Sequence, residues 1–193
     1  MSADDPRARG VALAPKVSLV GQMGAGKSSV AARLAELWQG AGYRAVDLDR
    51  EIEIEAGRSV AALFREAGEA YFRGLEASVL RALLGRPEPL IIATGGGAPC
   101  QPGAMAQLKA AGWVVWLEAS PETLARRALD PSRPLLAGMD LAAAEHFLTA
   151  QLTTRRPFYA QADVVVDASL PLDAVVAAIA GRVVPSNLLD PTR

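Results

Sequence analysis

The sequence predicts an α/β fold in which a five-stranded parallel sheet is covered by helices on both faces. Five short apolar runs have the length of a buried strand, and longer segments with a helical period separate them. Strands buried on both faces of a parallel sheet read as continuous apolar runs, and helical crossovers connect them. The predicted strands are Lys16–Val20, Arg44–Leu48, Leu90–Thr94, Trp113–Leu117 and Asp163–Val166.

The 193 residues fit one compact domain. Residues 1–14 and 185–193 lack periodicity, so we expect disordered tails on either side of a domain at 15–184. Within it, residues 129–140 contain two prolines, a glycine and an arginine between helical stretches. This composition favours a mobile lid, with a plain connecting loop as the alternative.

The first predicted strand leads directly into a phosphate-binding motif. Residues 21–28 read Gly-Gln-Met-Gly-Ala-Gly-Lys-Ser, a complete G-x-x-x-x-G-K-[ST] pattern, and a helical period over Ser28–Gln39 follows. Glycines let successive amides and the helix N-terminus point at a polyphosphate. In such a loop Lys27 neutralises the β- and γ-phosphates and the Ser28 hydroxyl coordinates Mg²⁺. We therefore predict an ATP site with Mg²⁺ as cofactor, formed by Gly24, Ala25, Gly26, Lys27, Ser28 and Ser29.

Composition narrows the class of nucleotide-binding protein. The net charge is −1 with no Lys/Arg-rich run, and no apolar stretch approaches the ~18 residues that span a bilayer. One cysteine and one histidine leave no zinc cluster or internal disulfide. No N-K-x-D element for guanine occurs, and the chain is too short for helicase or transporter cores. We expect a cytoplasmic, monomeric phosphotransferase for a small metabolite, without nucleic-acid or membrane partners.

An acidic pair follows the second apolar run. Asp47 and Asp49 flank Leu48, and if all three lie in the strand both carboxylates project from the same face at the sheet's carboxyl edge, where ligands bind in open α/β sheets. Such a pair suits a hydrated Mg²⁺ and the hydroxyls of a polyol. The alternative is a solvated turn in which the aspartates cap a helix.

Glycines replace the usual acid after the third apolar run. Gly95, Gly96 and Gly97 stand where many phosphate-loop proteins carry the aspartate that holds Mg²⁺, so we assign the metal-side role to Asp47, through water. Three glycines at the end of a strand let a ligand lie against the backbone.

Helix signals complete the pattern. Ser120-Pro121-Glu122 is a capped helix start, and Gln101-Pro102 opens another helix that Gly112 can close. In the apolar helical segment Glu69–Leu84, Arg73 and Glu76 lie three residues apart on one face. Arg73 either binds an anion or merely pairs with Glu76, and Arg155 could likewise be an ordinary surface charge.

Taken in order, these motifs resemble shikimate kinase over about Lys16–Val183. The resemblance rests on the phosphate loop, Asp-Leu-Asp, the triple glycine and further residues between and after them. These further residues are Gly57-Arg58-Ser59-Val60, Phe64, Gly68-Glu69, Phe72-Arg73, Glu76, Arg133-Pro134-Leu135-Leu136, Arg155 and Pro157-Phe158-Tyr159.

The resemblance implies a P-loop kinase fold of the nucleoside-monophosphate-kinase type, a three-layer sandwich with a mobile lid. It implies that Asp49 grips the ring hydroxyls and accepts the proton. Arg73, oriented by Glu76, and Arg155 would bind the shikimate carboxylate, with Gly95, Gly96 and Gly97 lining the ring. Arg133 resembles the lid arginine that closes over the transferring phosphoryl group, and Arg127 an arginine that packs on adenine. Lys27, Asp49 and Arg133 are thus the catalytic candidates.

The implied reaction is ATP-dependent phosphorylation of the 3-hydroxyl of shikimate, a step of aromatic amino acid biosynthesis. A gluconate-type small-molecule kinase and an inactive ligand-binding relative are the alternatives. An inactive relative is expected to have lost Lys27, Asp49 or Arg73, and all three are present.

Overall fold

The sheet has the predicted five strands. A computed structural model describes residues 16–129, 136 and 138–183. All strand pairs are parallel, in the order β2-β3-β1-β4-β5, with Val17 opposite Ile91 on one side and Trp113 on the other. This order puts the phosphate-loop strand β1 at the centre of the sheet. The strands are β1 Lys16–Val20, β2 Arg44–Asp47, β3 Leu90–Ala93, β4 Gly112–Glu118 and β5 Val164–Asp167.

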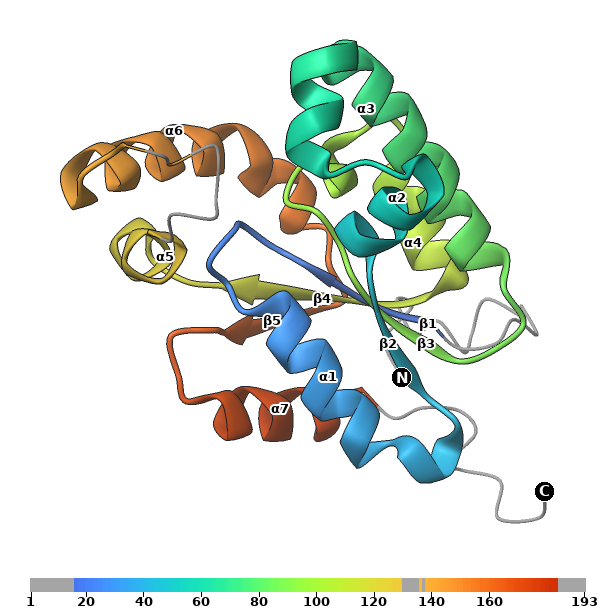
Figure 1. Ribbon diagram of the computed structural model, residues 1–193. Helices are drawn as coiled ribbons and strands as arrows, with labels where there is room; N and C mark the ends of the chain where they lie inside the picture. Colours follow the sequence, from blue (N-terminus) through green and yellow to red (C-terminus); the bar gives the residue numbers. More distant parts are fainter. Residues whose placement is uncertain (1–15, 130–135, 137, 184–193) are drawn as a thin grey trace.

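Helices cover both faces, which makes the predicted three layers (Figure 1). α1 and α7 lie on one face, and α2, α3 and α4 lie on the other, with α5 and α6 beside them. The helices are α1 Lys27–Leu37, α2 Leu48–Ala56, α3 Val60–Gly85, α4 Ala104–Ala111, α5 Pro121–Ala128, α6 Leu141–Tyr159 and α7 Leu172–Ala180, with short 3-10 turns η2 Gln39–Ala41 and η3 Ala98–Cys100.

Alternate strand residues enter two separate cores. In β3, Ile91 packs in the core with α1 and α7, whereas Ile92 packs in the core with α2, α3 and α4. In β4, Val115 and Trp116 divide in the same way. β3 is buried on both faces and is apolar throughout, as expected for a central strand of a parallel sheet, whereas β5 at the edge alternates buried and exposed residues.

The second strand ends earlier than predicted. β2 stops at Asp47, and Leu48 already belongs to α2, so strand alternation does not place Asp47 and Asp49 on one face. Asp47 is the N-cap of α2, where its Oδ1 accepts hydrogen bonds from the backbone N–H groups of Asp49 at 3.0 Å and Arg50 at 3.3 Å. These bonds satisfy free donors of the first helical turn. The alternative of a helix-capping aspartate was correct for Asp47.

Other helix boundaries follow their local signals. Ser120 caps α5 by accepting a hydrogen bond from the Thr123 N–H at 3.2 Å, as predicted. α4 begins at Ala104 rather than at Gln101-Pro102, because Gly103 takes a left-handed conformation and becomes the N-cap. The segment predicted at Glu69–Leu84 lies within α3, which is interrupted at Gly68 (φ 81°, ψ 169°).

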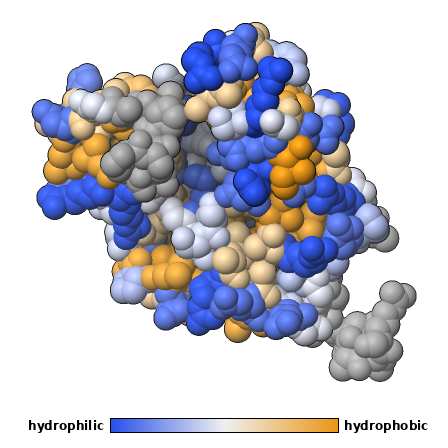
Figure 2. All heavy atoms as spheres, viewed as in Figure 1, coloured by the Kyte–Doolittle hydropathy of each residue, from blue (hydrophilic) through white to orange (hydrophobic). Residues whose placement is uncertain are grey.

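The strands all point the same way, so the segments after β1, β2 and β3 meet at one edge of the sheet. On the face shown in Figure 2 the surface is hollowed between α3 and the α5–α6 pair. None of the described helices is long and apolar enough to cross a membrane. Both predicted tails, and most of the predicted lid at 129–140, lie outside the described residues.

Candidate active site

The phosphate loop connects β1 to α1 at the sheet's carboxyl edge. Gly24 (φ 82°) has a left-handed backbone, and a Cβ atom there would lie 2.5 Å from the Leu124 carbonyl oxygen, so a larger residue does not fit. No side chain caps α1, and its first turn contains no acid. The amides and positive dipole end of α1 are therefore available for a phosphate.

Lys27 and Ser28 lie where the motif predicts. Lys27 Nζ donates to the backbone carbonyl oxygens of Gly21 at 2.8 Å and Gln22 at 2.9 Å. The ammonium group therefore lies against the backbone of the loop. Ser28 Oγ donates to Asp47 Oδ2 at 2.5 Å. A hydroxyl and a carboxylate thus meet beside the loop.

This pair fits a hydrated Mg²⁺. In the described part of the chain no group of three or more His, Cys, Asp or Glu side chains could hold a metal by itself. Mg²⁺ in kinases is held by one or two protein oxygens together with substrate phosphates and water. Ser28 Oγ and Asp47 Oδ2 are hard oxygen donors of that kind, so the donor set matches the predicted cofactor.

Asp49 lies in the first turn of α2 and faces the glycine loop. A Cβ atom at Gly95 would lie 3.0 Å from its Oδ1. Although its surface is accessible, protein atoms surround Asp49 on most sides, and this desolvation raises its pKa. The neighbouring Asp47 raises the pKa further, while Lys27 and Arg73 lower it. A carboxyl group with a raised pKa is better matched to accepting a proton near neutrality.

This raised pKa predicts that Asp49 weakens the fold. When the pKa of a carboxyl group is higher in the folded protein than in the unfolded chain, the protonated group stabilises the fold below the ordinary pKa of 3.8. This stabilisation is lost as the pH rises through the raised pKa, so the charged group destabilises the fold at neutral pH. Asp49→Asn should therefore raise Tm at pH 7, measured by thermal melts without ligand. The gain should disappear near pH 3.5. A lower Tm for the variant at pH 7 would contradict this assignment.

Arg73 is held by two carboxylates on its own helix. Its Nη1 donates to Glu76 Oε2 at 2.7 Å, and its Nε and Nη2 donate to Glu69 Oε1 at 3.3 and 3.2 Å. The rings of Phe64 and Phe72 lie 5.8 and 5.2 Å from its guanidinium carbon. Burial acts to lower the pKa of Arg73, but the bonds to Glu76 and Glu69 raise it overall. The guanidinium is therefore fixed in place and charged.

Glu76 is itself only 1% exposed, and burial raises its pKa despite its bond to Arg73. A buried carboxylate is costly unless it is paired. Glu76 therefore orients Arg73, and Arg73 in turn supplies the charge that makes the burial of Glu76 possible. The contact predicted from their spacing is present. Sequence reasoning gave no role to Glu69, although a spacing of four residues before Arg73 would have indicated the contact.

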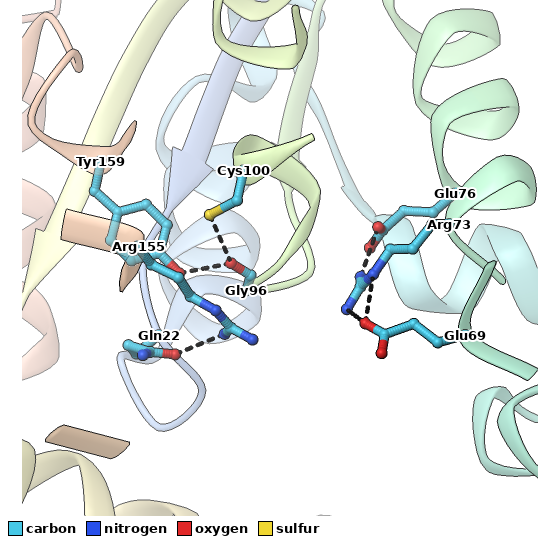
Figure 3. Close-up of polar contacts among 8 residues, drawn as sticks. All are labelled: Gln22, Glu69, Arg73, Glu76, Gly96, Cys100, Arg155 and Tyr159. Atoms are coloured by element: carbon cyan, nitrogen blue, oxygen red, sulfur yellow. Dashed lines mark hydrogen bonds and ion pairs between the residues drawn. The ribbon is translucent and has the colours of Figure 1, made fainter. Parts of the chain in front are cut away.

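Arg155 reaches the same space from the opposite side. It projects from α6 while Arg73 projects from α3, and the two guanidinium groups face each other across the site (Figure 3). Arg155 Nη1 donates to Gln22 Oε1 at 2.9 Å. Tyr159, one turn further along α6, donates its hydroxyl to the Gly96 carbonyl oxygen at 2.6 Å. Sequence reasoning assigned no function to Gln22 or Tyr159.

The three glycines give room to these side chains. A Cβ atom at Gly95 would lie 2.9 Å from Glu76 Oε1, one at Gly96 2.9 Å from Arg155 Nη1, and one at Gly97 2.7 Å from Arg73 Nη1. A side chain at any of the three glycines would therefore collide with a charged group of the site. The structure brings Asp49, Arg73, Arg155 and the triple glycine together, and the roles that the resemblance implies for them toward an acceptor stay predictions.

Gly97→Ala should weaken acceptor binding without straining the backbone. Gly97 has ordinary helical angles (φ −90°, ψ −20°), so alanine adds no backbone strain, but its methyl group would displace the Arg73 guanidinium. We expect KM for the acceptor to rise about tenfold, the loss of one hydrogen bond to a charged group, with KM for ATP unchanged in steady-state assays. Gly85→Ala, which meets no atom within 4 Å, is the matched control. An unchanged acceptor KM would contradict the steric role.

The structure describes one of the two remaining predicted arginines, Arg127. Arg127 donates to the backbone oxygens of Ala168 at 2.5 Å and Ser169 at 3.1 Å, which ties α5 to the segment after β5. Its predicted packing on adenine stays a prediction. Arg133 lies outside the described residues.

Together, the parallel sheet, the phosphate loop and the charged side chains beside it at one edge define a P-loop kinase. A family model described as "Shikimate kinase" matches residues 23–183. The shikimate kinase of Parasynechococcus marenigrum (strain WH8102) is 45% identical over 179 residues, which cover 91% of this chain and 88% of that protein. The chain belongs to the shikimate kinase family.

Solved structures agree with this assignment. Shikimate kinase from Bacteroides thetaiotaomicron matches with a TM-score of 0.80 and 32% identity, over 86% of this chain and 97% of that one. Shikimate kinase from Acinetobacter baumannii in complex with shikimate matches with a TM-score of 0.78 and 34% identity, over 90% and 94%. A gluconokinase from Sinorhizobium meliloti 1021 matches with a TM-score of 0.58 at 21% identity, which shows a shared fold.

Proposed function

We propose that this chain transfers the γ-phosphoryl group of ATP to the 3-hydroxyl of shikimate, giving shikimate 3-phosphate and ADP. The observation that carries the proposal is the convergence of Arg73, Arg155 and Asp49 on the glycine loop, beside a phosphate loop. Two guanidinium groups select an acidic acceptor over a neutral alcohol. The family named above, and the shikimate-bound relative, support the same acceptor.

On the acceptor side, Arg73 and Arg155 bind the carboxylate from opposite directions, and Gly95, Gly96 and Gly97 let the ring lie against the backbone. Asp49 binds the ring hydroxyls and accepts the proton of the 3-hydroxyl. As that proton leaves, the oxygen of the 3-hydroxyl bonds to the γ-phosphorus. The bond from that phosphorus to the bridging oxygen of ADP breaks in the same step, and ADP leaves with the electron pair.

On the nucleotide side, the amides of Gly24, Ala25, Gly26 and Ser29 surround the phosphates, and Lys27 compensates the charge of the β- and γ-groups. Ser28 would hold Mg²⁺ directly and Asp47 would hold it through water. When bound, Mg²⁺ supplies neutralising charge and orients the phosphates. We propose that Arg127 lies near adenine and that Arg133, on the lid, stabilises the equatorial oxygens during transfer.

We further propose a cytoplasmic, monomeric enzyme with ATP and shikimate as its partners, and no nucleic-acid or membrane partner. The net charge of −1 without a basic run supports the absence of a nucleic-acid partner. The reaction belongs to the biosynthesis of aromatic amino acids.

A coupled ADP-release assay with shikimate, gluconate and AMP as separate acceptors tests the proposal. We expect ATP- and Mg²⁺-dependent turnover with shikimate and none above the ATPase background with the other two. Turnover with gluconate or AMP instead would establish the alternative kinase. An inactive relative would turn over none of the three.

A further inference from the structure

Gln22 occupies an unusual place in the phosphate loop. It follows Val20 and Gly21 at the end of the central strand, and it is polar although only 1% exposed. Its backbone carbonyl oxygen accepts a hydrogen bond from Lys27 Nζ at 2.9 Å. Its side chain turns to the other half of the site, where Oε1 accepts from Arg155 Nη1 at 2.9 Å (Figure 3). One residue therefore contacts the phosphate lysine and the acceptor arginine.

The amide orientation of Gln22 is determined by its partner. A guanidinium has only donors, so the oxygen of the amide must face Arg155 and the nitrogen must point away. That nitrogen, Nε2, is buried and has no hydrogen-bond partner among the described residues. An unsatisfied buried donor destabilises a fold, so a glutamine here costs stability that an apolar side chain of the same length would not.

The two acceptor arginines differ in the charge of their partners. Arg73 bonds to the carboxylates of Glu76 and Glu69. Arg155 forms no direct ion pair with the described residues, although the Glu76 carboxylate interacts with it at longer range, and Gln22, to which it donates, is neutral. A neutral amide orients a guanidinium without adding an opposing charge, so the bond to Gln22 does not reduce the attraction of Arg155 for an anion.

We propose that Gln22 is a positioning residue for the acceptor: its amide oxygen aims Arg155 at the acceptor carboxylate without adding a negative charge beside it. The proposal rests on the proposed function, because it takes the acceptor to be a carboxylate bound by Arg155. It assigns a determinant of acceptor affinity to a variable position of the G-x-x-x-x-G-K-S pattern. The unsatisfied Nε2 is then a loss of stability accepted for acceptor binding.

Two variants separate orientation from charge. Gln22→Met keeps the length of the side chain but removes both polar atoms, so Arg155 loses its orienting bond and the unsatisfied donor disappears. We expect Kd for shikimate, measured by titration calorimetry, to rise about tenfold, the loss of one hydrogen bond to a charged group. Tm without ligand should stay equal or rise. Gln22→Glu keeps an oxygen acceptor but compensates Arg155, and should weaken binding more than Gln22→Met does.

Gln161→Met is the matched control, because Gln161 is exposed and its Nε2 donates to the Pro157 carbonyl oxygen. It should leave Kd for shikimate unchanged. If Gln22→Met and Gln22→Glu both bind shikimate with the Kd of the wild type, the role of Gln22 is overturned while the proposed reaction stands. A Gln22→Met variant that weakens binding only in proportion to a lower Tm would reduce Gln22 to a structural residue and also overturn it. Wild-type protein that does not bind shikimate would overturn both proposals.

Discussion

Asp49→Asn is expected to lower kcat for shikimate phosphorylation by about 10² to 10⁴, the usual contribution of a general base. Asparagine keeps the shape of the side chain and its bonds to ring hydroxyls, but it cannot accept the proton of the 3-hydroxyl. KM for ATP should change little, because the proposed role of Asp49 is toward the acceptor rather than the phosphates. Steady-state rates with saturating ATP and shikimate give the comparison.

The pH profile distinguishes a lost base from a distorted site. In the wild type, kcat/KM should fall as the pH drops through the pKa of Asp49, which burial places above its ordinary value. This acidic limb should be missing from the residual activity of Asp49→Asn. Asp173→Asn is the control and should keep the wild-type profile. Asp173 is an exposed aspartate of α7 that accepts a hydrogen bond from Arg33 of α1. Near-normal kcat in Asp49→Asn would refute the assignment of the base.

Arg73→Met is expected to lower kcat/KM for shikimate by about two to three orders of magnitude, chiefly through KM. Removing one partner of a buried charged pair costs about 2 to 5 kcal/mol. Arg73→Met removes the partner of Glu76 and, under the proposed function, that of the acceptor carboxylate. The variant should also melt at a lower temperature, since Glu76 is 1% exposed and would be left unpaired. Kinetics and thermal melts measure the two effects separately.

A double variant separates binding from stability. Arg73→Met combined with Glu76→Gln removes the uncompensated buried charge, so it should recover much of the lost Tm. It should not recover shikimate affinity, because the guanidinium is still missing. Recovery of kcat/KM by the double variant would show that Arg73 acts only by pairing with Glu76.

Much of the fold was predictable because its signals are local. The apolar runs gave all five strands, and the glycine-rich motif placed a strand before it and a helix after it. The β2–α2 boundary was wrong because Asp47 can end a strand or cap a helix, and the hydrogen bonds to Asp49 and Arg50 decide in favour of the cap. Alternation in a strand was therefore the wrong reason for grouping Asp47 with Asp49.

The candidate site was predictable where spacing carries the signal. Arg73 and Glu76 lie three residues apart on a helix, and their contact follows from helix geometry. The bond between Gln22 and Arg155 joins residues 133 positions apart, at a motif position that any residue can occupy. No local pattern marks it. The steric role of Gly97 beside Arg73 also depends on how α3 packs against the loop after β3.

A crystal structure with ADP, Mg²⁺ and shikimate bound would test the central claim most directly. We expect the ring carboxylate to lie within hydrogen-bond distance of Arg73 and Arg155, and the 3-hydroxyl to bond Asp49 while facing the phosphate loop. A ring bound away from Asp49, or a carboxylate held by other groups than these two arginines, would contradict the account.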